Sequence, residues 1–166
     1  MHYSIDTLNK VDKTEFIELL SAIYEETPAV AVRVWPSRPF QSLSDLHQKM
    51  ANIVNQMTLA EQLTLIRAHP ELGANVEMAD ASVREQAGAG LDQISEAEYA
   101  QLKALNEAYR RKFEFPFVMA VRGYGKAEIV AAIEARLDNA VAEERARSLQ
   151  EINQIAKLRL ETLISD

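Results

Sequence analysis

Apolar residues recur at intervals of three and four along most of this chain, and that spacing restricts the chain to a largely helical fold. The segment from Phe16 to Ile23 places its apolar residues on one helical face, and the segment from Leu46 to Met57 repeats the pattern. The five glycines and five prolines fall at the boundaries of such segments. We therefore expect separate helices joined by connections of a few residues.

Pairs of polar residues mark where several of these helices begin. Three pairs have the spacing of a capping box, in which two side chains satisfy free backbone N–H groups: Asp12 with Glu15, Thr58 with Glu61 and Ser95 with Glu98. Thr27 followed by Pro28 predicts an N-cap and a first helical residue. The helix after Thr58 must end near His69, because the residue before a proline is pushed out of the α region. Two more helices are predicted over about 126–137 and about 140–163.

One segment breaks the helical pattern. Large apolar residues alternate with other residues at Phe113, Phe115, Phe117, Met119 and Val121, which predicts an extended segment near 113–121. The chain offers this segment no partner strand. The predicted fold is an all-α, single-domain bundle over residues 1–166, with about seven or eight helices.

Composition excludes several classes of function. The formal net charge of −7 over 166 residues argues against a nucleic-acid-binding surface and against a polybasic patch that binds membranes. The chain has no cysteine, which excludes disulfides, thiolate metal sites and a cysteine nucleophile. No segment has the length and apolarity of a membrane span. We expect a cytoplasmic protein with neither nucleic-acid nor membrane partners.

His69 is the first candidate for chemistry. A histidine at the end of a helix can serve as an acid or base near neutral pH, or it can simply stabilise the helix dipole. His2 and His47 are weaker candidates, and His47 is expected on a solvated helix side. The three histidines lack the spacing of metal ligands, so we expect no metal site.

Ser82 and Glu85 are the second candidates. Their spacing is that of another capping box, which predicts a helix that begins at Ser82. The free N–H groups of that helix start could equally bind a polar ligand, and Gly88 and Gly90 allow a close approach of the backbone.

Arg159 lies within the apolar stripe of the last predicted helix, whereas Arg147 and Glu151 fall away from it. An inward arginine needs an anion, which can be a ligand or a core carboxylate, unless the side chain extends to the surface. Arg145 also falls near the stripe. The backbone of the extended segment needs partners too, from a ureide-like ligand, from helix caps or from water.

Four motifs in order, AHPELG, SVREQAGAGL, FPFVMAVRG and EINQIAKLRL, lie between Ala68 and Leu160. In this order they resemble the family of 2-oxo-4-hydroxy-4-carboxy-5-ureidoimidazoline (OHCU) decarboxylases, which form (S)-allantoin in the last step from urate. The resemblance extends from about Lys13 to Leu163. It implies an all-α enzyme that needs no cofactor, forms a homodimer and takes a small-molecule substrate. The loop 74–81 is short for the family.

The resemblance also implies roles for individual residues. His69, Glu85 and Arg159 match the catalytic residues of the family. The positions that match its substrate-contacting segments are Pro70, Ser82, Val83, Arg84, Glu85, Gln86, Phe117, Val118, Met119, Ala120, Val121 and Arg159.

Three other functions remain compatible with the residues alone. A non-catalytic helical module could bind a ureide or another small ligand with the same inward arginine and open backbone. A structural dimerisation protein would tolerate substitution of His69, Glu85 and Arg159. An enzyme of the same fold could act on a related ureide.

Overall fold

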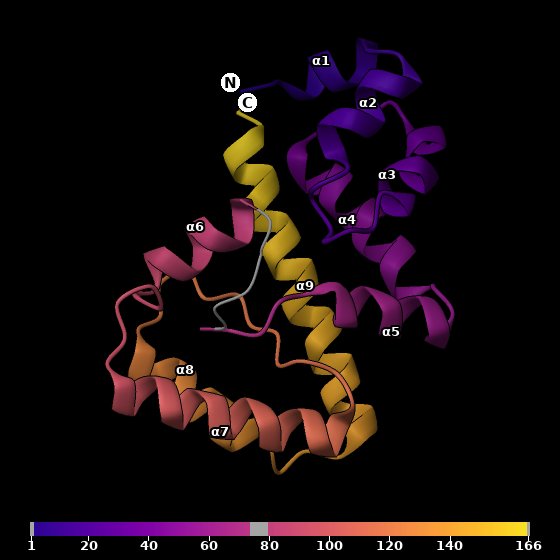
Figure 1. The fold of residues 1–166 in the computed structure, drawn as a ribbon. Helices are drawn as coiled ribbons and strands as arrows, with labels where there is room; N and C mark the ends of the chain where they lie inside the picture. Colours follow the sequence, from indigo (N-terminus) through magenta and orange to yellow (C-terminus); the bar gives the residue numbers. More distant parts are fainter. Residues whose placement is uncertain (1, 74–79, 166) are drawn as a thin grey trace. The chain divides into compact units, whose positions relative to one another are not determined.

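The computed structural model describes residues 2–73 and 80–165, and the described residues form an all-α fold without a β-strand (Figure 1). An isolated bridge joins Tyr3 to Ile164. The helices of the described residues are α1 (Ile5–Lys10), α2 (Lys13–Leu20), α3 (Ala29–Val34), the 3-10 turn η1 (Trp35–Ser37), α4 (Leu43–Asn55), α5 (Leu59–Ala68), α6 (Asp80–Gly88), α7 (Glu96–Phe113), α8 (Lys126–Arg136) and α9 (Val141–Leu163). The short α1, which the sequence analysis did not predict, begins at Ser4, whose side chain accepts a hydrogen bond from the Thr7 N–H.

The chain divides into two compact units. Unit 1 comprises Met1–Ala68 and Asn153–Asp166, and unit 2 comprises His69–Ile152. The prediction of one domain over the whole chain stays a prediction, and the two units are described separately below.

Unit 1 has a core between α2, α3 and α4. Phe16 of α2 is fully buried, with its ring against Trp35 at 5.2 Å and against Phe40 at 6.0 Å between ring centroids. Leu46 and Met50 of α4 are fully buried as well. The helical spacing of these apolar residues in the sequence therefore identified the buried faces correctly.

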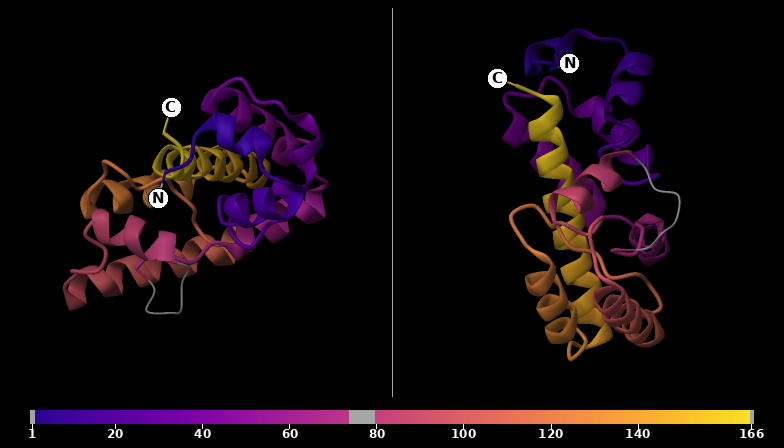
Figure 2. Two further views of the ribbon diagram at one scale, coloured as in Figure 1. Left: turned by 90° about the horizontal axis from the view of Figure 1, so that it is seen from above. Right: turned by 60° about the vertical axis from the view of Figure 1, so that its left-hand side comes forward.

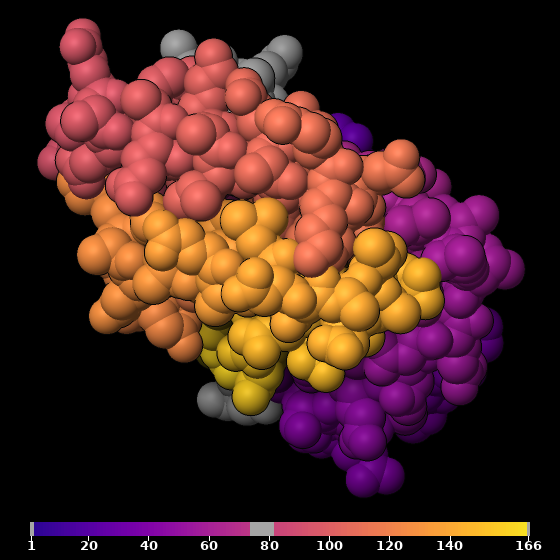
Figure 3. Space-filling model, turned by 90° about the horizontal axis from the view of Figure 1, so that it is seen from below, coloured from indigo at the N-terminus to yellow at the C-terminus, as the bar shows by residue number. Residues whose placement is uncertain are grey.

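Unit 2 is built around the pairing of α7 with α8, which Figures 1 and 2 allow the reader to follow. Tyr109 and Phe113 of α7 are buried and pack against Phe115 and Phe117, which follow the helix. Figure 3 shows the surface of this unit, where the salmon side chains of α7 lie beside the orange side chains of later residues. The aromatic cluster fixes the connection between α7 and α8 onto α7.

The predicted helix starts are mostly confirmed. Ser95 and Glu98 form a complete capping box, and Thr58 and Glu61 make the same reciprocal hydrogen bonds. Asp12 accepts from the Glu15 N–H as expected. The prediction at Thr27 was wrong by one residue, because Pro28 is the N-cap of α3. The Thr27 hydroxyl donates instead to the Glu25 carbonyl, at 2.7 Å.

The segment near 113–121 was predicted to be extended, and residues 115–121 form neither helix nor strand. Helix α7 continues to Phe113, and Glu114 then ends it in the left-handed conformation. Every residue from Phe115 to Val121 is buried. The alternation in the sequence therefore does not correspond to one buried and one exposed face.

Candidate functional site

His69 directly follows α5, as the proline at position 70 predicted, and its side chain is only 7% exposed. A histidine that merely stabilised a helix end at the surface would remain solvated. Burial instead limits the orientations that the imidazole can adopt. Pro70 beside it is half-buried.

The chain that follows His69 is held by α6 and α7 of the same unit. Glu71 forms an ion pair with Arg110, and the Leu72 carbonyl accepts from Asn106 Nδ2 at 3.0 Å. The N–H of Gly73 donates to Gln86 Oε1 at 2.9 Å. Three consecutive residues are therefore fixed by side chains distant in sequence.

Gly73 could not be replaced without strain at this point. Its φ of +73° is a conformation that other residues rarely adopt, and a Cβ would lie 2.4 Å from Leu102 Cδ2. The glycine thus permits the close approach of the chain after His69 to α7.

Helix α6 carries the second group of predicted residues and begins two residues earlier than predicted. Ser82 is therefore inside the helix, not at its N-cap. The spacing of Ser82 and Glu85 also fits two residues on one helical face, and that alternative is what the structure has.

One face of α6 is polar and yet directed inward. Ser82 and Gln86 are buried, Glu85 is half-buried, and Ala89 beyond the helix continues the buried face. Val83 is 46% exposed, and the Arg84 side chain is exposed as well. Of the five predicted contacts on this helix, the structure therefore gathers three on a buried face and leaves two at the surface.

The segment Phe117–Val121 is buried in unit 2, and its backbone has partners at three atoms. The Val118 carbonyl accepts from Arg136 at 2.8 Å, and the Val121 carbonyl accepts from the Tyr124 N–H at 3.0 Å. The Ala120 N–H donates to a carboxylate oxygen of Glu151 at 3.5 Å. Side chains of α8 and α9 thus supply some of the hydrogen-bond partners that this backbone needs, which the sequence alone could not assign to a ligand or to the protein.

Arg159 belongs to unit 1 and is buried within the apolar stripe of α9, as predicted. Its guanidinium forms an ion pair with Glu25 at 3.0 Å, and its NH1 group donates to the Ala22 carbonyl at 3.2 Å. A core carboxylate, one of the partners that the sequence allowed, is therefore present in the structure. Glu25 was missed, because a charged residue in the connection between two helices carries no sequence signal of burial.

Two weaker candidates were also placed. His47 is not on a solvated side, because its Nε2 lies 2.8 Å from the Asn153 carbonyl and the residue is half-buried. Arg145 is half-buried too, and less enclosed than Arg159. The part of the predicted loop at 74–79 lies outside the described residues.

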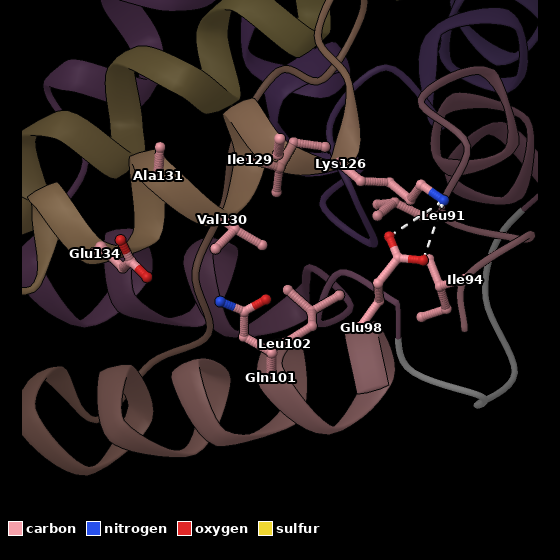
Figure 4. A pocket seen from close by; sticks show the side chains of 11 residues that line it. Leu91, Ile94, Glu98, Gln101, Leu102, Lys126, Ile129, Val130, Ala131 and Glu134 are labelled. Carbon is pink, nitrogen blue, oxygen red and sulfur yellow. Dashed lines mark hydrogen bonds and ion pairs between the residues drawn. The ribbon is translucent and has the colours of Figure 1, made fainter. Parts of the chain in front are cut away.

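A pocket of about 370 Å³ lies between α7 and α8 (Figure 4). Its walls are mostly aliphatic, and the ion pair between Lys126 and Glu98 crosses one end. No predicted site residue lines this pocket, and it contains no histidine. We therefore do not assign it to the chemistry of His69.

Residues 2–73 and 80–165 contain no group of three or more histidine or acidic side chains that could hold a metal ion. In the same part of the chain, no helix combines the length and the apolarity of a membrane span.

Comparison with known proteins gives one consistent family. The model of the OHCU decarboxylase family matches residues 9–161. A 2-oxo-4-hydroxy-4-carboxy-5-ureidoimidazoline decarboxylase from Halalkalicoccus jeotgali is 45% identical over 160 residues, which cover 96% of this chain and 91% of that protein. The uric acid degradation bifunctional protein PucL of Bacillus subtilis is 42% identical over 164 residues, covering 99% of this chain and 33% of that protein.

Solved structures agree in fold. The crystal structure of (S)-allantoin synthase superposes with a TM-score of 0.82 at 26% identity, over 98% of this chain and 54% of that chain, so this chain spans about half its length. An OHCU decarboxylase crystallised in the presence of (S)-allantoin has a TM-score of 0.73 at 24% identity. That match covers 94% of this chain and 100% of that chain.

Proposed function

Because this chain belongs to the OHCU decarboxylase family, we propose that it converts OHCU to (S)-allantoin in the degradation of urate. One observation carries the proposal beyond the family match. The buried His69 is followed closely by Gly73, whose N–H donates to Gln86 on α6, the helix that also carries Ser82 and Glu85. Polar side chains are rarely buried in an apolar interior unless they serve a hydrogen-bonded network or a ligand.

The substrate supplies the electron sink of this reaction. OHCU carries a carboxylate and a hydroxyl on one ring carbon beside a ring C=N bond. When the bond to the carboxylate breaks and carbon dioxide leaves, its electron pair forms a C=C bond with the adjacent ring carbon, and the C=N pair moves to the nitrogen, which takes up a proton. The hydroxyl then loses its proton to become a carbonyl, and the adjacent ring carbon gains a proton on one face to give the (S) product. The protein's tasks are orientation and proton transfer, so we expect no cofactor.

We assign the proton transfer to His69, as acid or base at the reacting carbon or its hydroxyl. A positioned group of this kind contributes about 10²–10⁴-fold to the rate. Burial of the ring supports the assignment, because it limits the orientations of the imidazole, whereas a solvated histidine would have no fixed orientation.

The remaining roles concern binding. Glu85 accepts hydrogen bonds from ring or ureido N–H groups of the substrate, with Ser82 and Gln86 beside it on the same buried face. The backbone of Phe117–Val121 fixes the ureido arm. Arg159 binds an anionic or carbonyl oxygen of the substrate, and its ion pair with Glu25 holds the guanidinium in one orientation.

Two further properties of the family are proposed for this chain. We expect a homodimer, which light scattering on the purified protein would measure directly. We also expect the protein in the cytoplasm, which fractionation of the source cells would test.

The function is tested by generating OHCU freshly from urate and following the circular dichroism of the product with and without protein. Spontaneous decay gives racemic allantoin and therefore no lasting signal. The proposal predicts rapid growth of a signal with the sign of (S)-allantoin. A folded protein that leaves the signal at zero would refute the enzyme, and binding of ureides would then support the non-catalytic module.

A further inference from the structure

A buried ion pair joins the end of α8 to the start of α9 in unit 2. The side chains of Arg136 and Glu144 are 8% and 0% exposed. Arg136 Nε donates to Glu144 Oε1 at 2.6 Å, and the NH2 group lies 2.5 Å from the same oxygen. Neither residue belongs to the predicted site, and the reaction proposed above does not use them.

Glu144 is held by more than the arginine. The Tyr109 hydroxyl donates to its Oε1 at 2.5 Å, and Asn139 Nδ2 donates to its Oε2 at 2.9 Å. Burial, reinforced by the bond to Glu144, raises the pKa of Tyr109 above its ordinary value, so the phenol remains a donor. The carboxylate is therefore fixed by residues from α7 and α8 and from the α8–α9 connection.

Arg136 in turn contacts the proposed substrate-binding segment Phe117–Val121. Its NH1 group donates to the Val118 carbonyl at 2.8 Å, and its guanidinium carbon lies 4.3 Å from the centroid of the Phe117 ring. The Tyr109 ring meets the Phe117 ring edge-on, at 5.3 Å and 90°. Arg136 and Tyr109, which both hydrogen-bond to Glu144, thus both contact Phe117, and Arg136 also holds Val118.

Stability alone does not explain this arrangement. A buried ion pair commonly contributes no more to folding than an apolar pair of similar volume, because both charges must be removed from water. The pair does something that apolar side chains cannot do, since a guanidinium anchored by a carboxylate fixes a carbonyl oxygen in position and direction.

We propose that Arg136, anchored by Glu144, is a positioning residue that fixes the backbone of Phe117–Val121 for the ureido arm of the substrate. The inference rests on the proposed function, which assigns that backbone to substrate binding. Arg136 acts through Val118, so its loss should weaken binding more than the chemical step. We expect KM to rise about tenfold, the effect of one misplaced hydrogen bond, with kcat changed less than about threefold.

The experiment compares three variants of the full chain. Arg136→Met with Glu144→Leu replaces both charges by apolar groups of similar size, so that no buried charge is left unpaired. Arg136→Lys keeps the charge opposite Glu144, but its ammonium lacks the fork that serves Glu144 and Val118 together. Arg111→Met is the matched control, because it also removes one arginine of unit 2, and Arg111 is exposed on α7.

Two quantities are measured on protein shown to be folded by circular dichroism. Steady-state kinetics give KM and kcat separately, and hydrogen–deuterium exchange reports the peptide that contains Phe117–Val121. We expect raised KM and faster exchange in both the double variant and Arg136→Lys, with both quantities unchanged in Arg111→Met.

The outcomes separate the inference from the proposed function. Folded Arg136→Lys with wild-type KM and wild-type exchange overturns the inference, and this holds even where the double variant does not fold. Faster exchange in a protein whose wild type shows no turnover refutes the decarboxylase activity and leaves the network as the anchor of the segment. Faster exchange with unchanged KM also overturns the inference, because the segment then does not position the substrate.

Discussion

The buried pair of Glu25 and Arg159 gives the sharpest prediction for unit 1. Replacing Glu25 by glutamine keeps the shape of the side chain and removes its charge. At 3.0 Å and an effective dielectric constant of about 20, the pair attracts by about 5 kcal/mol, part of which offsets desolvation. The Ala22 carbonyl, which also accepts from Arg159, cannot neutralise the cation. We expect the free energy of unfolding to fall by about 3–5 kcal/mol.

Urea denaturation followed by helical circular dichroism measures this loss. Glu26→Gln is the matched control, because Glu26 is adjacent in sequence and exposed, and its change should stay within about 0.5 kcal/mol. A double variant, Glu25→Gln with Arg159→Met, removes both charges and should recover most of the stability while remaining inactive. If Glu25→Gln lost less than about 1 kcal/mol, the pair would not be desolvated and the reasoning would be refuted.

Three further predictions concern α6, a helix start and two buried phenols. Ser82→Ala should lower kcat/KM by about tenfold, the effect of a lost hydrogen bond to substrate, while exposed Val83→Ala leaves it within twofold in the same assay. Ser95→Ala should lower the free energy of unfolding by about 1 kcal/mol in urea, because its side chain caps α7. Burial raises the pKa of Tyr24 and Tyr109, so their contribution to stability is complete below about pH 10 and is lost as the pH rises further. Phenolate absorbance from two of the five tyrosines should therefore appear only together with unfolding, and ionisation of all five phenols in folded protein would contradict this.

The helices could be predicted because their signals are local. Ser95 and Glu98 satisfy each other's backbone within one turn, and the proline at position 70 ends α5 by its own geometry. The same reasoning misplaced the start of α6, because the spacing of Ser82 and Glu85 also fits one helical face. Which of the two applies depends on what packs against the helix.

The partners of buried charges could not be predicted, since they are far apart in sequence. Glu25 meets Arg159 across most of the chain, and nothing near Glu25 indicates burial. For Arg136 a signal did exist, because it shares a face with Ile129 and Ile133 at spacings of seven and three. That pattern predicts an inward arginine but not the carboxylate and carbonyl that receive it.

The same limit applies to the site around His69. The motifs identified the histidine and the helix that carries Ser82, but the bond from Gly73 to Gln86 depends on tertiary packing. Asn106 likewise holds the Leu72 carbonyl from α7. Both contacts join residues that sequence spacing leaves unrelated.

The central claim, that His69 carries the proton transfer of the decarboxylation, is tested most directly by one comparison of kcat/KM. His69→Ala is measured beside His2→Ala, which removes an exposed histidine near the N-terminus, in the dichroism assay with fresh OHCU. The account predicts a loss of about 10²–10⁴-fold for His69→Ala and no change for His2→Ala. A folded His69→Ala variant with the activity of the wild type would contradict it.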